Sequence, residues 1–85
     1  MNFGVQFSGT VPAGQSQRYF THSWNANSNV VWTIVPTGPA VDGGAQIEWK
    51  VQCARQTPTL LKWFLEIKNV TNAPVNFEAR YAILN

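Results

Sequence analysis

The feature of the sequence that most limits the fold is an alternation of apolar and polar residues with a period of two. It is clearest in the segment 46–54, QIEWKVQCA, where every second residue from Ile47 to Cys53 is apolar. Successive side chains of a strand point to opposite faces, so this period predicts a strand with one buried face. Segments 60–69 and 75–84 repeat it, and no useful length of chain shows helical spacing. The sequence therefore predicts an all-β protein.

Three more strands are predicted at 3–11, 16–24 and 30–35, with a long Pro- and Gly-rich loop at 36–45. The last three strands of the chain have short links, which favour an antiparallel meander. Six strands with apolar faces have to cover one another. We therefore expect one domain over 1–85, with about six to seven strands that close into a small antiparallel β-sandwich or a small barrel.

The large apolar residues give a predicted core. Trp49 and Trp63 alternate with charged residues and are expected to point inward, as is Cys53, a small apolar residue in the same pattern. Phe20 and Trp32 are also assigned to the core. Asn69 follows a strand directly and is expected to form a turn.

The charge of the chain limits the classes of partner. The net charge is +2, the six basic residues are scattered, and only 12% of residues are charged, about half the usual ~25%. A nucleic-acid-binding protein would gather its basic residues on one stripe, so nucleic acid is not expected as a partner. A weakly charged polar surface suits a protein neighbour or an uncharged sugar. No apolar run reaches the ~18 residues of a membrane span.

Catalytic and metal-binding groups are scarce. One histidine and one cysteine cannot form a zinc site or a disulfide. Glu48, Glu66 and Glu78 fall on the polar faces of strands among lysines and arginine, as in cross-strand ion pairs. We therefore expect no enzymatic activity, no cofactor and no metal.

The segment 19–32, YFTHSWNANSNVVW, combines aromatic rings with asparagines. Sugar recognition uses a ring that meets the apolar face of a pyranose, together with planar amides or carboxylates that bond its hydroxyls. In strict alternation, Tyr19 opposes Phe20, His22 and Trp24, so one of the two sets has to face outward. The sequence predicts a lectin-like rim for neutral carbohydrate made of His22, Trp24, Asn25, Asn27, Asn29 and Asp42. The alternative is that NANSN is only a polar loop and Asp42 only a turn residue.

An alternative is a structural subunit that self-assembles into a filament, a particle or a toxin complex. Phe64 is predicted to project from a polar face between Lys62 and Glu66, where an exposed ring suggests a contact. With Phe3 and Tyr19 it forms the predicted interface set. Both hypotheses predict a homo-oligomer, because so much aromatic bulk in a short chain leaves an apolar patch to cover.

Two segments resemble a known family. FSGTVPAGQSQRYFTHSW and WFLEIKNVTNAPVNFEARYAIL are similar to the opening and closing hairpins of bacterial pre-peptidase C-terminal domains. The likeness covers about half the chain and implies a non-catalytic, jelly-roll-like accessory module that adheres to polysaccharide or protein. The middle of the chain lacks the acidic strand and turn of those domains, so no site residue is transferred.

The N-terminal segment MNFGVQFSGTV has no basic region followed by an unbroken apolar stretch, which a secretion signal needs. The expected location is the cytoplasm, with export by a non-classical route as the alternative.

Overall fold

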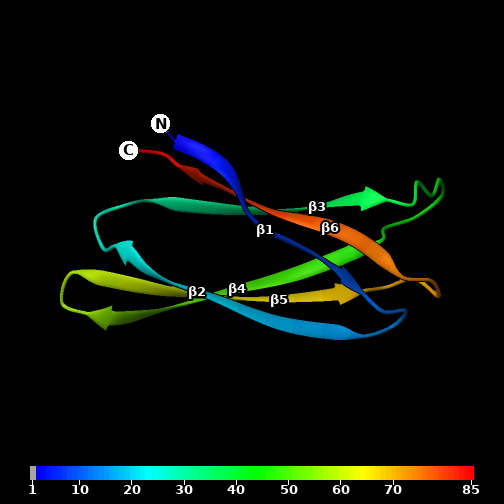
Figure 1. Ribbon diagram of the computed structural model, residues 1–85, viewed down its shortest axis with the longest axis horizontal. Coiled ribbons are helices and arrows are strands. Elements are labelled where there is room, and N and C mark those ends of the chain that lie inside the picture. Colours follow the sequence, from blue (N-terminus) through cyan, green and yellow to red (C-terminus); the bar gives the residue numbers. More distant parts are fainter. Residues whose placement is uncertain (1) are drawn as a thin grey trace.

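The computed structural model describes residues 2–85, which form six strands (Figure 1). None of these residues lies in a helix, so the all-β prediction is confirmed. The described residues accordingly include no helix that is long and apolar enough to cross a membrane. The strands are β1 (Asn2–Val11), β2 (Ser16–Asn25), β3 (Val30–Gly38), β4 (Ile47–Thr57), β5 (Leu60–Asn69) and β6 (Val75–Ile83).

The strands form two antiparallel sheets that pack face to face. Sheet A has the order β1-β6-β3 and sheet B the order β2-β5-β4. The first strand pairs with the last and the second with the fifth, which is the nested pairing of a jelly roll, here with six strands. The predicted single-domain β-sandwich is therefore confirmed.

The predicted meander of the last three strands is wrong. β4 and β5 form a hairpin in sheet B, but β6 lies in sheet A between β1 and β3. Stacked sheets lie only about 10 Å apart, so the short link 70–74 spans the gap as readily as it would turn within one sheet. Two strands are also longer than predicted: β3 continues to Gly38 and β4 to Thr57.

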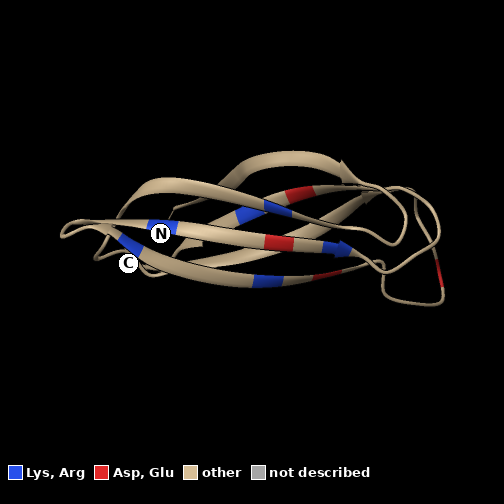
Figure 2. Ribbon diagram, turned by 90° about the horizontal axis from the view of Figure 1, so that it is seen from below, with Lys and Arg blue, Asp and Glu red and all other residues tan. Residues whose placement is uncertain are grey.

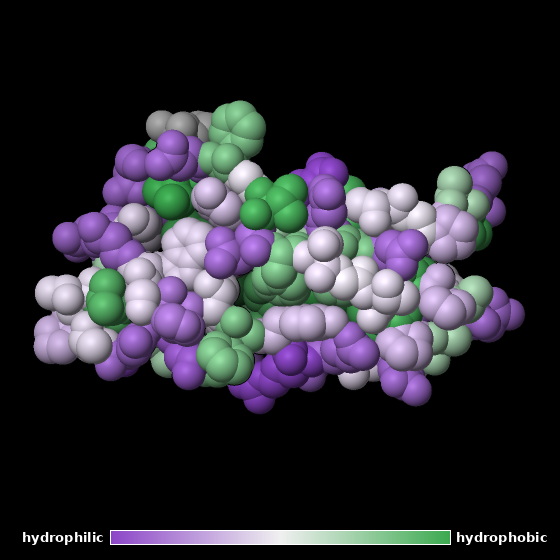
Figure 3. All heavy atoms as spheres, viewed as in Figure 1, coloured by the Kyte–Doolittle hydropathy of each residue, from purple (hydrophilic) through white to green (hydrophobic). Residues whose placement is uncertain are grey.

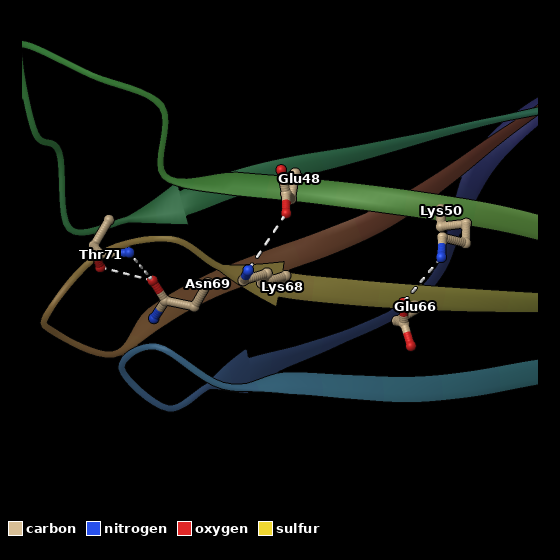
Figure 4. Close-up of polar contacts among 6 residues, drawn as sticks. All are labelled: Glu48, Lys50, Glu66, Lys68, Asn69 and Thr71. Atoms are coloured by element: carbon tan, nitrogen blue, oxygen red, sulfur yellow. Dashed lines mark hydrogen bonds and ion pairs between the residues drawn. The ribbon is translucent and has the colours of Figure 1, made fainter.

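Asn69 organises one end of the sandwich (Figure 4). Its side chain is fully buried, and its amide nitrogen donates hydrogen bonds to the carbonyl oxygens of Val11, at 3.0 Å, and Ala73, at 2.7 Å. Its Oδ1 accepts hydrogen bonds from the backbone nitrogen of Thr71, at 2.8 Å, and from the Thr71 hydroxyl, at 2.7 Å. The predicted turn at Asn69 is confirmed, and this residue also ties the turn to β1.

The core has two parts along the length of the sheets. One part is aliphatic with a single phenylalanine, and Phe7 and Tyr19 pack against it; its members are Val11, Ile34, Ile47, Ile67, Val75, Phe77 and Ala79. The other part is a cluster of aromatic rings from both sheets, Trp24, Trp32, Trp63 and Tyr81. Trp32 is 6% exposed, which confirms its predicted place in the core.

The sandwich is open along β4. Trp49 and Val51 pair with Ile67 and Leu65, which are fully buried, so they point toward the interior as predicted. They are nevertheless 41% and 37% exposed, and Cys53 is exposed as well. The predicted burial of Trp49 and Cys53 is wrong because sheet A contacts β4 only slightly. Alternation shows which face of a strand is apolar, but not whether another layer covers it.

Candidate binding site

A β-bulge in β2 decides which of its side chains face solvent. Thr21 pairs with Trp63 and Trp24 with Leu61, so two residues of β2 oppose one residue of β5 between these pairs. Ser23 at the bulge has a φ of 66°, in the left-handed region that few non-glycine residues occupy. The extra residue shifts the alternation by one. Trp24 therefore points inward, although Phe20 and His22 point outward.

Trp24 is consequently not part of an exposed rim, and this prediction is corrected. Its ring contacts those of Trp32 and Tyr81, each at a centroid distance of 5.4 Å. Its Nε1 donates a hydrogen bond of 2.8 Å to the Thr21 hydroxyl. The ring is half-buried and closes the aromatic end of the core.

Phe20 is the large ring that β2 exposes. It is 61% exposed, so its predicted place in the core is wrong. The Nζ of Lys62 lies over the ring, 4.5 Å from its centroid, and the ring of His22 lies 6.5 Å away. A cation over an aromatic face is attracted by the ring quadrupole, by about 0.5–1 kcal/mol at an exposed site. Lys62 thus helps to fix the orientation of an otherwise free ring.

A groove runs between β1 and β2, the edge strands on one side of the two sheets. It has a volume of about 660 Å³, within the range of small-molecule sites. It combines aromatic rings with amide, hydroxyl, imidazole and guanidinium groups, and it is lined by Gln6, Phe7, Ser8, Arg18, Tyr19, Phe20, Thr21 and His22.

The base of the groove is held by the core. Phe7 and Tyr19 contact each other at a centroid distance of 4.9 Å, and both pack against Phe77. The Tyr19 hydroxyl donates a hydrogen bond to Gln17, and burial raises the pKa of this hydroxyl above its ordinary value. Tyr19 was predicted at an interface; it is half-buried and supports the groove, and a contact with another molecule there stays a prediction.

The polar side chains around the groove differ in how many of their hydrogen-bonding atoms already have a partner in the protein. The Nε2 of Gln6 donates a long hydrogen bond of 3.4 Å to the Thr21 hydroxyl, which already accepts one from Trp24. His22 Nδ1 lies 2.9 Å from the hydroxyl of Ser23, which leaves its Nε2 facing outward from this contact. Gln6 and His22 therefore keep hydrogen-bonding capacity for a ligand.

The three predicted asparagines do not line the groove. They hold the turn between β2 and β3: Asn25 Oδ1 accepts a hydrogen bond from the backbone nitrogen of Asn27, at 2.8 Å, and the backbone nitrogen of Asn29 donates to Asn85, also at 2.8 Å. Asn25 and Asn27 also border a hollow of about 480 Å³ with Arg55. No aromatic ring lines that hollow.

Asp42 lies in the loop between β3 and β4, whereas Asn25 ends β2 and Asn27 and Asn29 lie in the loop before β3. These loops are at opposite ends of β3, so the predicted grouping of Asp42 with the asparagines is wrong. The prediction grouped these residues because their side chains have similar chemistry. In the fold, the length of β3 separates them.

The outer face of sheet B carries the predicted charge pairs (Figures 2 and 4). Lys50 pairs with Glu66 and Lys68 with Glu48, each at 3.8 Å between neighbouring strands. The blue and red segments of Figure 2 are interspersed along the strands and form no stripe of one sign. The pair of Arg80 and Glu78, at 2.9 Å, lies within β6.

Two residues of the predicted interface set remain on the surface. Phe64 lies on the outer face of sheet B, half-buried, with the guanidinium of Arg18 4.9 Å from its centroid. Phe3 is 78% exposed on β1. An interface at either residue stays a prediction.

In the part of the chain that the structure describes, the side chains that could bind a metal do not form a cluster. Among residues 2–85, no three His, Cys, Asp or Glu side chains lie close enough to hold an ion together. The groove residues Phe20 and Gln6 were missed because a strictly alternating pattern gives no sign of the two bulges, one in β2 between Thr21 and Trp24 and one in β1 at Gln6. The one available signal was the pair Tyr19–Phe20 itself, two rings on opposite faces of a strand.

The chain was compared with known proteins. No family model matches it, and neither the curated proteins nor the solved structures contain a significant match.

Proposed function

We propose that the protein is a non-enzymatic, lectin-like module that binds neutral carbohydrate in the groove between β1 and β2. The observation that carries the proposal is the ring of Phe20, 61% exposed on the border of a groove of about 660 Å³ that also presents amide, hydroxyl and imidazole groups. The site differs from the rim predicted from the sequence, because Phe20, and not Trp24, provides the aromatic ring for the sugar.

The groove residues supply both interactions that a sugar needs. The exposed part of the Phe20 ring offers an apolar surface to the C–H groups of a pyranose. Gln6 and His22 offer planar groups that donate and accept hydrogen bonds from hydroxyls. Because the core holds the base of the groove, the site is largely formed before a ligand arrives, which lowers the entropy cost of binding.

Phe20→Ala tests the proposal, with Phe3→Ala as the matched control on another face. Both rings are exposed, so both variants should fold. After a glycan array has identified a retained sugar, calorimetry should show binding weakened by about 1–3 kcal/mol in Phe20→Ala, from the apolar area that the ring loses. Phe3→Ala should bind as the wild type does. An array on which no glycan is retained, or equal affinities for wild type and Phe20→Ala, would exclude the groove.

A self-assembling structural subunit is the second candidate, and a separate observation favours it. The outer face of sheet A carries Phe3, Val5 and Val31, which are 78%, 51% and 48% exposed. Phe3 and Val31 both pair with Ala82, so they flank it on neighbouring strands. Figure 3 shows several hydrophobic areas that interrupt the hydrophilic surface on the face of the molecule drawn there. Contiguous exposed apolar surface is typical of protein interaction sites.

This candidate predicts assemblies that a charge on sheet A would disperse. Phe3→Asp should reduce the mass seen by light scattering, while Val70→Asp, at a site 43% exposed outside the strands, should leave it unchanged. Equal masses for the two variants would count against assembly through sheet A.

A further inference from the structure

β4 is an edge strand whose interior face is left uncovered. It is an 11-residue strand, it contains no proline, and its one neighbour is β5. The side away from β5 therefore presents unpaired backbone groups, and Trp49, Val51 and Cys53 add apolar surface beside them. A long, apolar edge of this kind is a template for pairing with another strand, and soluble proteins normally shorten, charge or cover it.

We propose that β4 pairs antiparallel with β4 of a second copy of the chain, around a two-fold axis at Gln52. The two B sheets then join into one sheet of six strands. The regular part of the pairing runs from Trp49 to Arg55, which are equally distant from Gln52 along the chain; a β-bulge follows between Arg55 and Thr57. This inference does not depend on whether the groove binds sugar or whether sheet A assembles.

The interior face of β4 is complementary to itself in this register. The axis places Trp49 opposite the partner's Arg55, where a guanidinium can stack on the indole. It places Val51 opposite the partner's Cys53, so two small apolar side chains meet. Each contact occurs twice because a two-fold interface repeats every pair. The exposed apolar side chains of β4 thus find partners within the same strand sequence.

The outer face of β4 offers no electrostatic obstacle. Lys50 faces the partner's Ala54, and Glu48 lies beside the partner's bulge at Gln56, so no like charges oppose each other. Lys50 and Glu48 keep their ion pairs with Glu66 and Lys68 of their own sheet. Like charges directly opposite would destabilise a strand pair, and their absence favours a second copy as the occupant of this edge.

The mass of the protein in solution tests the pairing. Sedimentation velocity of the full chain at micromolar concentration should give twice the 9.5 kDa of one chain. Val51→Lys places an ammonium on the interior face of the edge and should give a monomer. The variant should still fold, because Val51 is 37% exposed, and circular dichroism checks this. Val70→Lys, a matched change 43% exposed outside the strands, should remain a dimer.

A disulfide tests the register. In a Cys53→Ser background, Gln52→Cys should cross-link fully on mild oxidation, because a residue on the axis faces its own copy at about 4.5–5.5 Å between Cα atoms, within reach of a disulfide. Ala54→Cys in the same background is the control. Its two copies lie about four residues apart along the paired strands, roughly 13 Å, so it should not cross-link.

Each outcome bears on the proposal. A single-chain mass for the wild type, a Val51→Lys variant that remains dimeric, or equal cross-linking of both cysteine variants would overturn it. Dissociation by Phe3→Asp but not by Val51→Lys would place the interface on sheet A instead. Glycan binding by a monomeric Val51→Lys variant would leave the groove proposal intact, so the two proposals fail separately.

Discussion

Asn69 shows how one buried polar side chain can connect the two halves of a sandwich. Its amide group bonds the last residue of β1 and both sides of the turn before β6. A buried polar group is tolerated when its hydrogen bonds are all made, and its removal leaves the partners unsatisfied. The residue therefore has a structural role that its polar type alone would not suggest.

Asn69→Ala should lower the free energy of unfolding by about 2–4 kcal/mol, because the carbonyl of Val11 and the amide of Thr71 lose their partner and the carbonyl of Ala73 loses one of two donors. Urea denaturation followed by tryptophan fluorescence measures the change. Asn72→Ala, an exposed asparagine in the same turn, is the control and should change stability by less than about 0.5 kcal/mol. Similar losses in both variants would contradict the role of Asn69.

Tyr19 gives a prediction about pH. Burial raises the pKa of its hydroxyl in the folded state, so the folded protein favours the neutral phenol. The stability that this provides is fully present below the unfolded pKa of about 10 and is lost as the pH rises through the folded value. Between pH 8 and 11 the unfolding free energy of the wild type should fall more steeply than that of Tyr19→Phe. Parallel curves in urea titrations would contradict this assignment.

In β2, the sequence alone did not predict correctly which side chains face solvent. Alternation grouped Trp24 with Phe20 and His22, and one added residue at Ser23 separated them. The bulge leaves no mark on the apolar spacing because its two residues, His22 and Ser23, are both polar. For this reason the fold of β2 was predictable, but the identity of its exposed ring was not.

At the scale of the strands, the charged faces were predicted correctly. Lys50 with Glu66 and Lys68 with Glu48 form the expected cross-strand pairs on sheet B. Both pairs are well exposed, and exposed ion pairs contribute little, typically about 0–1 kcal/mol. The pairs are therefore expected to add little to the stability of the fold.

Glu48→Gln should therefore change the unfolding free energy by less than about 1 kcal/mol, and the difference from wild type should shrink at high salt, which screens exposed charges. Thermal unfolding in 0.05 M and 1 M NaCl measures both effects. Glu66→Gln, which removes the acid of the second exposed pair on the same sheet face, serves as the comparison. A large, salt-independent loss would show that the pair is more important than its exposure indicates.

The pairing of the strands was less predictable than their faces. The links between β4 and β5 and between β5 and β6 are both short, yet one turns within a sheet and the other crosses between sheets. What separates them is the turn around Asn69, whose bonds to β1 draw the chain toward sheet A. Such long-range bonds are not visible in local sequence patterns.

At the scale of the whole molecule, most contacts join residues far apart in the sequence, because β1 pairs with β6 and β2 with β5. Such a topology folds slowly and unfolds as a unit. The central strands β5 and β6 have neighbours on both sides, whereas the other strands have a free edge. Stability is therefore expected to be highest in the middle of each sheet.

The rates of native-state hydrogen exchange, measured by NMR, should be lowest in the strands that are expected to be most stable. Amides of β5 and β6 should exchange most slowly, through global unfolding, and amides on the free edges of β1 and β2 most quickly. If β4 pairs with a second copy as proposed, its amides from Trp49 to Arg55 are bonded either to β5 or to the second copy, so this part of the strand should be protected in the wild type. In Val51→Lys, alternate amides of β4 should become as fast as those of β1. An unchanged β4 profile in the two proteins would show that this edge is free in both.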